Sequence, residues 1–467
     1  MKTSFTRSLY ILLTLFLAAC GPLAPTPTVT PSATSVPSST PTLPPTETSM
    51  PEPQQPPACT FPLEQTTMEE SMPENYPFSE PRVVLADPKG NFEIVEWLPD
   101  SQRALIVRTI IENHYEQYQS IELFDPNKIK VQVYAKRDRL SNTPPLWAAG
   151  LDALIYPERK VASYSYDENG TIIEGSIILN PISHLLWLSN GNLDTAKKLK
   201  DVQFNSPDEP DEWNTIAKPD GSQVIYLEAT GENSYQIHSR MVSQGSLEDE
   251  QLIPFNSVQI PNNERPINYD MVWRPNTTQI LFSSSQYALG GSYSFLFDIN
   301  TGKICSLDFG TTGARQWALA ARWSPNGRYL AIIRTSGSIP IDFSDLAVLD
   351  TMTGNLYTLA FSPQNVEGRR YVWDIAWAPD NYHLAAIGRV SAFPHCAPNC
   401  MEEVGRLYLV DFVSGNADLL FPSFQFTGGG LGDSLAWSPD GTKILANCWA
   451  ESTGRLCLIS VQRTTPP

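Results

Sequence analysis

The sequence predicts an all-β protein, a seven-bladed β-propeller that follows a signal peptide and a disordered linker. Three observations carry this prediction. One segment pattern recurs seven times, its occurrences lie 50 to 70 residues apart, and turn-forming residues are abundant, with 40 prolines and 27 glycines among 467 residues. A period of this size fits a four-stranded blade with variable loops. Because one repeat is degenerate, six blades are the alternative.

The first 19 residues have the pattern of a signal peptide. Lys2 and Arg7 supply a positively charged start, and residues 9–17 form an apolar run too short for a permanent membrane span. The run ends in Leu17-Ala18-Ala19-Cys20-Gly21, which resembles the lipobox of bacterial lipoproteins. The resemblance implies that Cys20 is acylated and anchors the chain to a lipid bilayer on the extracytoplasmic side, at the cell surface or in the periplasm. An ordinary cleavage site with an incidental cysteine is the alternative.

A linker follows the lipobox. Residues 20–58 consist largely of proline, threonine, serine and small residues. The segment has too few large apolar side chains to offset the entropy lost when a chain becomes ordered. We therefore expect a disordered tether of polyproline-II character. At about 3 Å per residue it reaches as far as about 100 Å. Residues 59–81 form an irregular lead-in, residues 82–463 the propeller and residues 464–467 a tail.

Each repeat holds an apolar strand that ends in an aromatic residue, a turn of the Pro-Asp-Gly type and a second apolar strand. Arg322-Trp323-Ser324-Pro325-Asn326-Gly327 shows the pattern. Proline fixes φ, Asp or Asn bonds back to its own backbone and glycine tolerates a positive φ, so the two strands form a hairpin. The aligned aromatic positions are 97, 147, 217, 273, 323, 377 and 437, and all but Ala217 are tryptophan. We expect these tryptophans to form the core between blades.

A second hairpin completes each blade. Phe295–Asp298 and Gly302–Leu307 are one example, and similar pairs occur in most repeats. The last repeat contains only three strands, the third at residues 455–461. We expect residues 82–85 to supply its outer strand, because closing the ring removes strand edges that would otherwise promote aggregation.

These repeats resemble the WD-repeat-like propellers of the TolB type, whose turns read W-S-P-D-G before a short apolar strand. The resemblance covers residues 82–463 and implies a propeller that serves as a binding or protein-interaction platform. Two departures are visible: no Gly-His precedes the strands, and no α/β domain precedes the propeller. In the second repeat Gly150-Leu151 replaces the Pro-Asp pair.

The charge and the motifs narrow the functional classes. A net charge of −18 argues against nucleic acid as a partner and against a polybasic membrane-binding surface. The sequence contains no G-x-S-x-G, H-E-x-x-H, phosphate-binding loop or dinucleotide fingerprint. We therefore predict no cofactor and expect a protein partner in the cell envelope. The alternative is a propeller enzyme, or a protein that binds a small ligand or cation, with its site at the central channel.

One set of residues could form such a channel site. The residue three positions before each aligned aromatic enters the inner strand, and four of these residues carry polar oxygen atoms: Asn214, Asp270, Asp374 and Ser434. Oxygen ligands of this kind suit Ca²⁺ or a small polar ligand. Capping and solvation of the strand starts is the alternative, and the pattern favours it.

Cysteine usage fits an exported protein, in which disulfides persist. Beyond Cys20 six cysteines remain, an even number. Cys448 and Cys457 flank a hairpin and are expected to pair, and Cys396 and Cys400 are expected to close a small ring. A zinc site at His395, Cys396 and Cys400 is the alternative, but it lacks a fourth ligand. Cys59 and Cys305 are left over, and the spacing gives no reason to pair them.

Overall fold

A computed structural model of the chain describes most of residues 57–464. Residues 53–467 form one compact unit. The described residues exclude 1–56, 64–71, 89, 114–115, 139–143, 164–177, 193–195, 203–214, 219–221, 232–233, 244–245, 254–268, 287–290, 308, 310–315, 337–342, 360–368, 392–404, 428–433, 450–453 and 465–467. The predicted signal peptide, Cys20, most of the tether, Asn214, Cys396 and Cys400 therefore lie outside them. In the part of the chain that is described, no helix combines the length and hydropathy needed to cross a bilayer.

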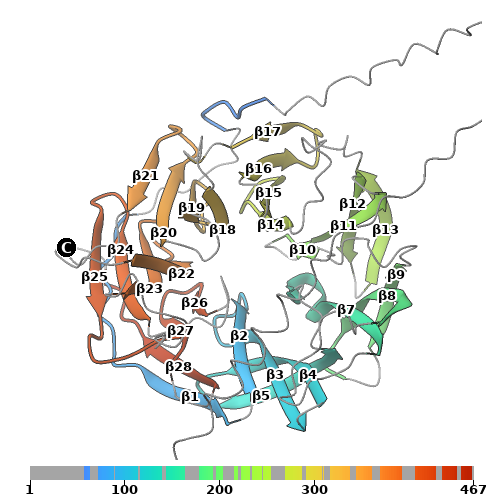
Figure 1. Cartoon of the computed structure of the whole chain (residues 1–467), viewed down its shortest axis with the longest axis horizontal. Helices are drawn as coiled ribbons and strands as arrows, with labels where there is room; N and C mark the ends of the chain where they lie inside the picture. Colours follow the sequence, from blue (N-terminus) through green and yellow to red (C-terminus); the bar gives the residue numbers. More distant parts are fainter. Residues whose placement is uncertain are drawn as a thin grey trace, which may run out of the picture. The chain divides into compact units, whose positions relative to one another are not determined.

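Seven four-stranded antiparallel sheets are arranged in chain order around a ring, which confirms the β-propeller (Figure 1). Blade 1 is β2 (Gly90–Trp97), β3 (Ala104–Asn113), β4 (Glu116–Asp125) and β5 (Lys130–Asp138). Blade 2 is β6 (Leu146–Ala148), β7 (Ala153–Ser163), β8 (Ile178–Ser189) and β9 (Lys197–Val202), with the short 3₁₀ helix η1 (Ala149–Leu151). Blade 3 is β10 (Thr215–Ala217), β11 (Gln223–Gly231), β12 (Ser234–Ser243) and β13 (Ser246–Ile253).

The remaining blades follow the same order from the inside of the ring outward. Blade 4 is β14 (Tyr269–Trp273), β15 (Gln279–Gln286), β16 (Gly291–Asp298) and β17 (Ile304–Ser306). Blade 5 is β18 (Gln316–Trp323), β19 (Tyr329–Ser336), β20 (Phe343–Asp350) and β21 (Leu356–Leu359). Blade 6 is β22 (Arg369–Trp377), β23 (His383–Ser391), β24 (Arg406–Asp411) and β25 (Asn416–Leu420). Blade 7 is β26 (Leu435–Trp437), β27 (Lys443–Asn447), β28 (Gly454–Ser460) and β1 (Arg82–Asp87).

The outer strand of blade 7 comes from the start of the propeller, as the sequence predicts. β1 pairs antiparallel with β28, with Arg82 opposite Leu458 and Asp87 opposite Gly454. The chain then passes directly into β2, the inner strand of blade 1. The first and last repeats are therefore joined by backbone hydrogen bonds within one sheet.

The turn between the first two strands of a blade has the geometry that its sequence requires. In blade 5 the N–H of Gly327 donates to the carbonyl oxygen of Ser324 at 2.8 Å, and the Oδ1 atom of Asn326 accepts the N–H of Arg328 at 3.0 Å. Gly327 has a φ of 71°, and a Cβ atom there would lie 2.6 Å from the carbonyl oxygen of Pro275. Glycine is required here both by the backbone conformation and by the close approach of blade 4.

The repeated tryptophans fill the interfaces between blades, which confirms their predicted role. Trp377 of blade 6 packs in one core cluster with Ala331 and Leu346 of blade 5. Its Nε1 atom donates to the carbonyl oxygen of Arg322 at 2.9 Å. Where the ring closes between blades 7 and 1, the Nε1 atom of Trp97 likewise donates to the carbonyl oxygen of Ala436 in blade 7 at 3.0 Å. Each described tryptophan of the series thus packs against the preceding blade.

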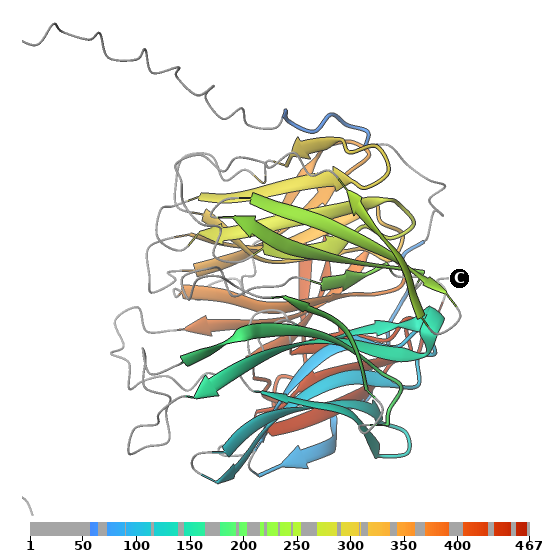
Figure 2. The same cartoon turned by 90° about the vertical axis from the view of Figure 1, so that its right-hand side faces the viewer.

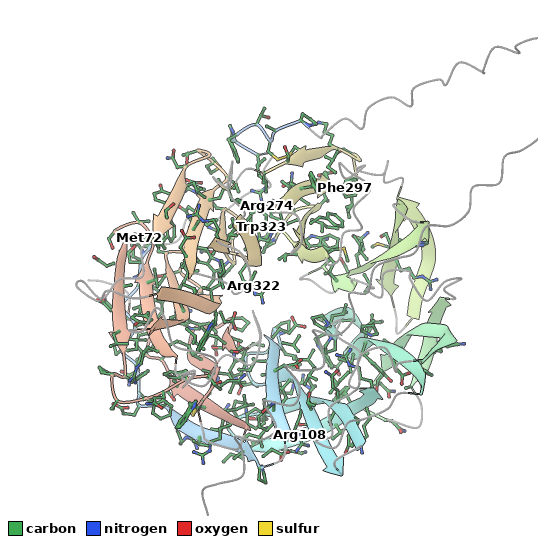
Figure 3. All side chains as sticks on the ribbon, in the orientation of Figure 1. Met72, Arg108, Arg274, Phe297, Arg322 and Trp323 are labelled. Atoms are coloured by element: carbon green, nitrogen blue, oxygen red, sulfur yellow. A yellow bond between two sulfur atoms is a disulfide. The ribbon has the colours of Figure 1, made fainter. Side chains whose placement is uncertain are left out.

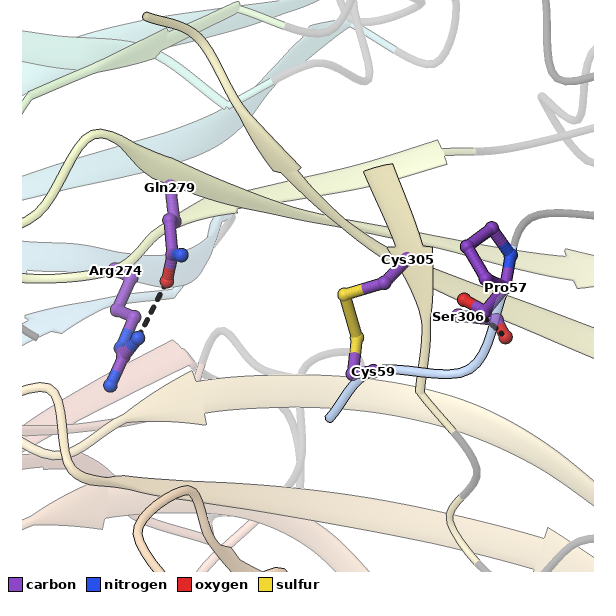
Figure 4. The surroundings of a disulfide bond; sticks show 6 residues. All are labelled: Pro57, Cys59, Arg274, Gln279, Cys305 and Ser306. Atoms are coloured by element: carbon purple, nitrogen blue, oxygen red, sulfur yellow. Dashed lines mark hydrogen bonds between the residues drawn. A yellow bond between two sulfur atoms is a disulfide. The ribbon is translucent and has the colours of Figure 1, made fainter. Parts of the chain in front are cut away.

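The lead-in contains no named helix or strand where it is described, and it contacts the propeller through isolated bridges and side chains. We call residues 57–63 and 72–79 together the strap. Its first part lies on the outer edge of blade 4, where Ala58 forms a parallel bridge with Ser306. The N–H of Cys59 donates to the carbonyl oxygen of Ser306 at 2.9 Å, and a disulfide joins Cys59 to Cys305, 246 residues away (Figure 4).

Leu63 continues the strap onto blade 5. Its N–H donates to the carbonyl oxygen of Thr351 at 3.0 Å, and its side chain is buried in the core between blades 4 and 5. The receiving surface is held in place by Arg274 of blade 4. The fully buried guanidinium of Arg274 donates to the Oγ1 atom of Thr351 at 3.0 Å and to the Oε1 atom of Gln279 at 2.5 Å (Figure 4). Burial lowers the pKa of Arg274 to about 10, so this cation stays charged at neutral pH.

The second part of the strap lies on blades 6 and 7. The N–H of Glu74 donates to the Oδ2 atom of Asp380 at 3.0 Å, and the Glu74 carboxylate accepts the Nε–H of Arg463 at 2.7 Å. Tyr76 is buried and meets the ring of Trp437 edge-on, with 5.0 Å between ring centroids. The lead-in therefore spans four blades before it becomes β1.

Two disulfides are present among the described cysteines. The predicted pair Cys448–Cys457 is confirmed and joins residues nine positions apart in blade 7. The pair Cys59–Cys305 was not predictable from spacing, because the fold alone brings together residues so far apart in sequence.

Candidate functional site

Two of the four residues that the sequence analysis singles out, Asp270 and Asp374, lie on inner strands of the ring. Asp270 lies in β14, opposite Ser283, but its side chain is outside the described part of the structure. Asp374 lies in β22, and Ser434 immediately precedes β26. These two residues come from neighbouring blades and are in direct contact. The structure thus brings together two of the four candidates.

Asp374 joins blade 6 to blade 7. Its Oδ2 atom accepts the N–H of Ser434 at 2.7 Å, and its Oδ1 atom accepts the N–H of Ile375 at 2.8 Å. Both Asp374 and Ser434 are fully buried. A carboxylate that accepts backbone N–H groups on both oxygens and has no solvent access acts as a structural cap. This arrangement corresponds to the capping alternative for these two residues.

The polar contacts continue from blade 7 to blade 1. The N–H of Asn447 donates to the carbonyl oxygen of Ser434 at 2.9 Å, and its Nδ2 atom donates to the carbonyl oxygen of Phe92 at 2.9 Å. Asn447 is buried, and its Oδ1 atom has no hydrogen-bond partner among the described residues. Asp374, Ser434 and Asn447 therefore link blades 6, 7 and 1 through buried hydrogen bonds.

A metal centre is not evident in the described part of the chain. No group of three or more histidine, cysteine, aspartate or glutamate residues there is placed to hold a metal ion. The cysteines and the histidine of the alternative zinc site, residues 395, 396 and 400, lie outside the described residues.

Glu96 is a candidate that the sequence analysis missed. It lies next to Trp97 in β2, and its Oε1 atom accepts the N–H of Trp147 from blade 2 at 3.1 Å. The residue is exposed to solvent. An exposed carboxylate that accepts one backbone N–H keeps acceptor capacity for a cationic group.

Arg322 occupies the matching position in blade 5. Figure 3 shows it on the inner side of β18, directed toward the middle of the ring. It is half-buried, and its Nη1 atom donates to the carbonyl oxygen of Ala321 at 3.1 Å. Glu96 and Arg322 share one feature in the sequence, a charged side chain directly before the aligned tryptophan. The other five repeats have an apolar residue at this position: Leu146, Ile216, Val272, Ala376 and Ala436.

A second titratable cluster lies under the strap. The Nδ1 atom of His383 is 2.6 Å from the Oδ2 atom of Asp380, which also receives the N–H of Glu74. Burial would lower the pKa of His383, but the hydrogen bond and the negative charge of Asp380 together raise it above 6.5. Burial would raise the pKa of Asp380, but the bond to His383 and the backbone N–H groups of Tyr382 and Glu74 together lower it. The cluster is therefore an ion pair between pH values near 4 and 6.5.

The comparisons with known proteins bear on the fold and not on the function. No protein-family model matches the sequence, and no characterised protein shows significant sequence similarity to it. Similar solved structures include an oligogalacturonate lyase in complex with manganese, which is 12% identical with a TM-score of 0.47 and covers 85% of this chain and 99% of that chain. TolB from Acinetobacter baumannii is 15% identical with a TM-score of 0.36, covering 75% and 79%. A prolyl endopeptidase is 10% identical with a TM-score of 0.44, covering 71% and 42%. At such identities the likeness concerns the fold alone.

Replacing Asp374 should destabilise the propeller without affecting an exposed partner site. In Asp374→Ala the N–H groups of Ser434 and Ile375 lose their buried acceptor, and we expect a loss of about 1–3 kcal/mol in the free energy of unfolding. Denaturant melts measure this loss. Asp418→Ala, an exposed carboxylate of the same blade, is the control and should change stability by less than about 0.5 kcal/mol. Equal stability of the two variants would contradict the capping role.

The His383–Asp380 contact should make stability depend on pH. Because the folded-state pKa of His383 is raised, its contribution is complete below pH 6.5 and is lost as the pH rises through the folded pKa. The difference in melting temperature between wild type and His383→Gln should therefore be largest near pH 5.5 and shrink toward pH 9. Asp380 acts oppositely: its contribution is lost as the pH falls through its lowered pKa. A difference that stays constant from pH 5.5 to 9 would rule out the charged pair.

Proposed function

We propose that this chain is a lipid-anchored, extracytoplasmic lipoprotein whose propeller binds a partner protein of the cell envelope. The observation that carries the anchor is Cys20, placed directly after Leu-Ala-Ala at the end of an apolar leader. Two acyl chains or more give stable attachment to a bilayer. The disulfides Cys59–Cys305 and Cys448–Cys457 support the extracytoplasmic location, because such bonds persist in oxidising compartments.

The unequal faces of the ring support the binding role. In an antiparallel blade the connections after the first and third strands leave at one face, and those after the second and fourth strands leave at the other. On the first face the connections are short, as at residues 324–328 and 351–355. On the second face several are longer, as at residues 254–268 and 421–434, although two residues are enough between β3 and β4 and between β11 and β12. Long connections on a rigid scaffold are a common place for binding residues.

The strap occupies the face with the short connections. The N–H groups of Leu63 and Glu74 donate to Thr351 and Asp380, which both lie in short connections. Arg463, which is bonded to Glu74 of the strap, also donates to the carbonyl oxygen of Asp440 in a third short connection. Figure 2 shows the ring from the side, with its two faces toward the left and the right. A partner is therefore expected on the opposite, long-connection face. The net charge of −18 favours a partner with a positively charged contact surface.

Acylation is tested by metabolic labelling of the full-length chain with a fatty-acid analogue in a bacterial host. Wild type should take up the label, and Cys20→Ala should take up none, because the thiol that carries the lipid is gone. Cys59→Ala, a variant of another cysteine near the N-terminus, should be labelled like wild type. Label on Cys20→Ala would overturn the anchor.

The binding face is tested by placing a photo-crosslinking amino acid at one of two exposed lysines of blade 1. Lys136 lies near the end of β5 at the long-connection face, and Lys128 lies in the turn before β5 at the opposite face. We expect an adduct of defined mass from position 136 in intact cells and none from position 128. Adducts from position 128 alone would place the partner on the strap face and contradict this assignment.

A further inference from the structure

The two disulfides differ in their accessibility to other thiols. Cys448 and Cys457 are buried, with exposed fractions of 2% and 0%. Cys59 and Cys305 are only half-buried, and they lie at the outer edge of blade 4. Exchange requires a thiolate to reach a disulfide sulfur, so access separates a reactive disulfide from an inert one. Of the two disulfides, Cys59–Cys305 is the more accessible one.

The first part of the strap has few non-covalent contacts. Leu63 is the only buried side chain of residues 57–63. The backbone contacts at the edge of blade 4 are limited by β17, which is three residues long. They consist of the N–H of Cys59 bonded to Ser306 and the N–H of Ser306 bonded to Pro57. The ring of Phe61 also lies over Gly354 of blade 5, but it remains exposed. One buried leucine, this partly covered ring and a few backbone bonds are small against the entropy of ordering seven residues.

The second part of the strap is held much more firmly. Tyr76 is buried against Trp437, and Phe78 packs on the same ring with 6.0 Å between centroids. Backbone bonds run in both directions between Asn75 and Thr464, at 3.0 and 3.1 Å. The chain then continues into β1, which is paired along its length with β28. This part needs no covalent bond to remain in place.

We infer that Cys59–Cys305 is a thiol-exchange site that controls whether residues 57–63 stay on blades 4 and 5. The co-reactant is a reducing dithiol, such as the active site of a thiol–disulfide oxidoreductase. One dithiol sulfur attacks a sulfur of the pair and the S–S bond breaks. The second dithiol sulfur then resolves the mixed disulfide. Two electrons pass to the protein, Cys59 and Cys305 each gain a proton, and the dithiol becomes a disulfide.

Release changes where the tether is attached. In the oxidised chain the first fixed point is at Pro57, and after reduction it moves to Glu74. The 17 residues between these points allow about 50 Å of added reach at about 3 Å per residue. This consequence rests on the proposed lipid anchor, because only an anchored tether sets the distance from a membrane. The release itself does not depend on the anchor.

The test is amide hydrogen exchange, resolved to single residues, on the purified full-length chain with and without mild dithiothreitol. In the oxidised chain we expect Cys59, Leu63 and Ser306 to be protected by the bonds described above. After reduction their exchange should accelerate by about tenfold or more, while Asn75 and Ser79, bonded to Thr464 and Ser460, keep their protection. Mass analysis of alkylated peptides should show Cys59 and Cys305 modified, and Cys448 and Cys457 unmodified.

Two outcomes would overturn the inference. Unchanged protection at Cys59 and Leu63 in a chain with both thiols alkylated would show that non-covalent contacts hold the first part of the strap. Loss of protection that extends to Asn75 and Ser79 would show that the strap has no separable first part. The variant Cys59→Ser/Cys305→Ser should show the released pattern without reductant, and Cys448→Ser/Cys457→Ser should keep the oxidised pattern. None of these measurements involves lipid, so they test the release of the strap even if Cys20 carries no lipid.

Discussion

Closure of the ring is the constraint on which the rest of the structure depends. Each blade can bury its faces only against two neighbours, so an open ring would leave two apolar sheet faces exposed. The pairing of β1 with β28 removes this problem by building one blade from both ends of the propeller. Trp97 adds a core contact at the same place, because it packs on blade 7 and bonds to Ala436.

The strap extends this closure well beyond a single strand. A closing strand alone connects blades 7 and 1, whereas the strap also contacts blades 4, 5 and 6. In the chain-entropy model, a bridge between residues 246 positions apart limits the unfolded chain far more than one between residues nine positions apart. The model gives about 5.5 kcal/mol for the first and about 2.6 kcal/mol for the second. The long disulfide therefore combines the larger stabilisation with the more accessible position.

Much of this fold could be predicted from the sequence because its repeats have local causes. The Pro-Asn-Gly turn before Arg328 and the tryptophan at 323 each follow from residue chemistry within a few positions. The closing strand could be predicted because a ring must pair its last edge. The strap could not, since its contacts join residues such as Leu63 and Thr351 that no local pattern relates.

The candidate site shows the same division between local and distant causes. Of the positions three before the aligned aromatics, Asp270 and Asp374 lie on inner strands and Ser434 immediately precedes one, but position alone does not say whether an oxygen is available. Asp374 has both oxygens bonded to backbone N–H groups, so it stabilises the junction of blades 6 and 7. Glu96 accepts an N–H from the backbone of blade 2 and is exposed to solvent. A polar residue on an inner strand is thus available for chemistry only where the neighbouring blade leaves its lone pairs unused, and that depends on the packing of two blades.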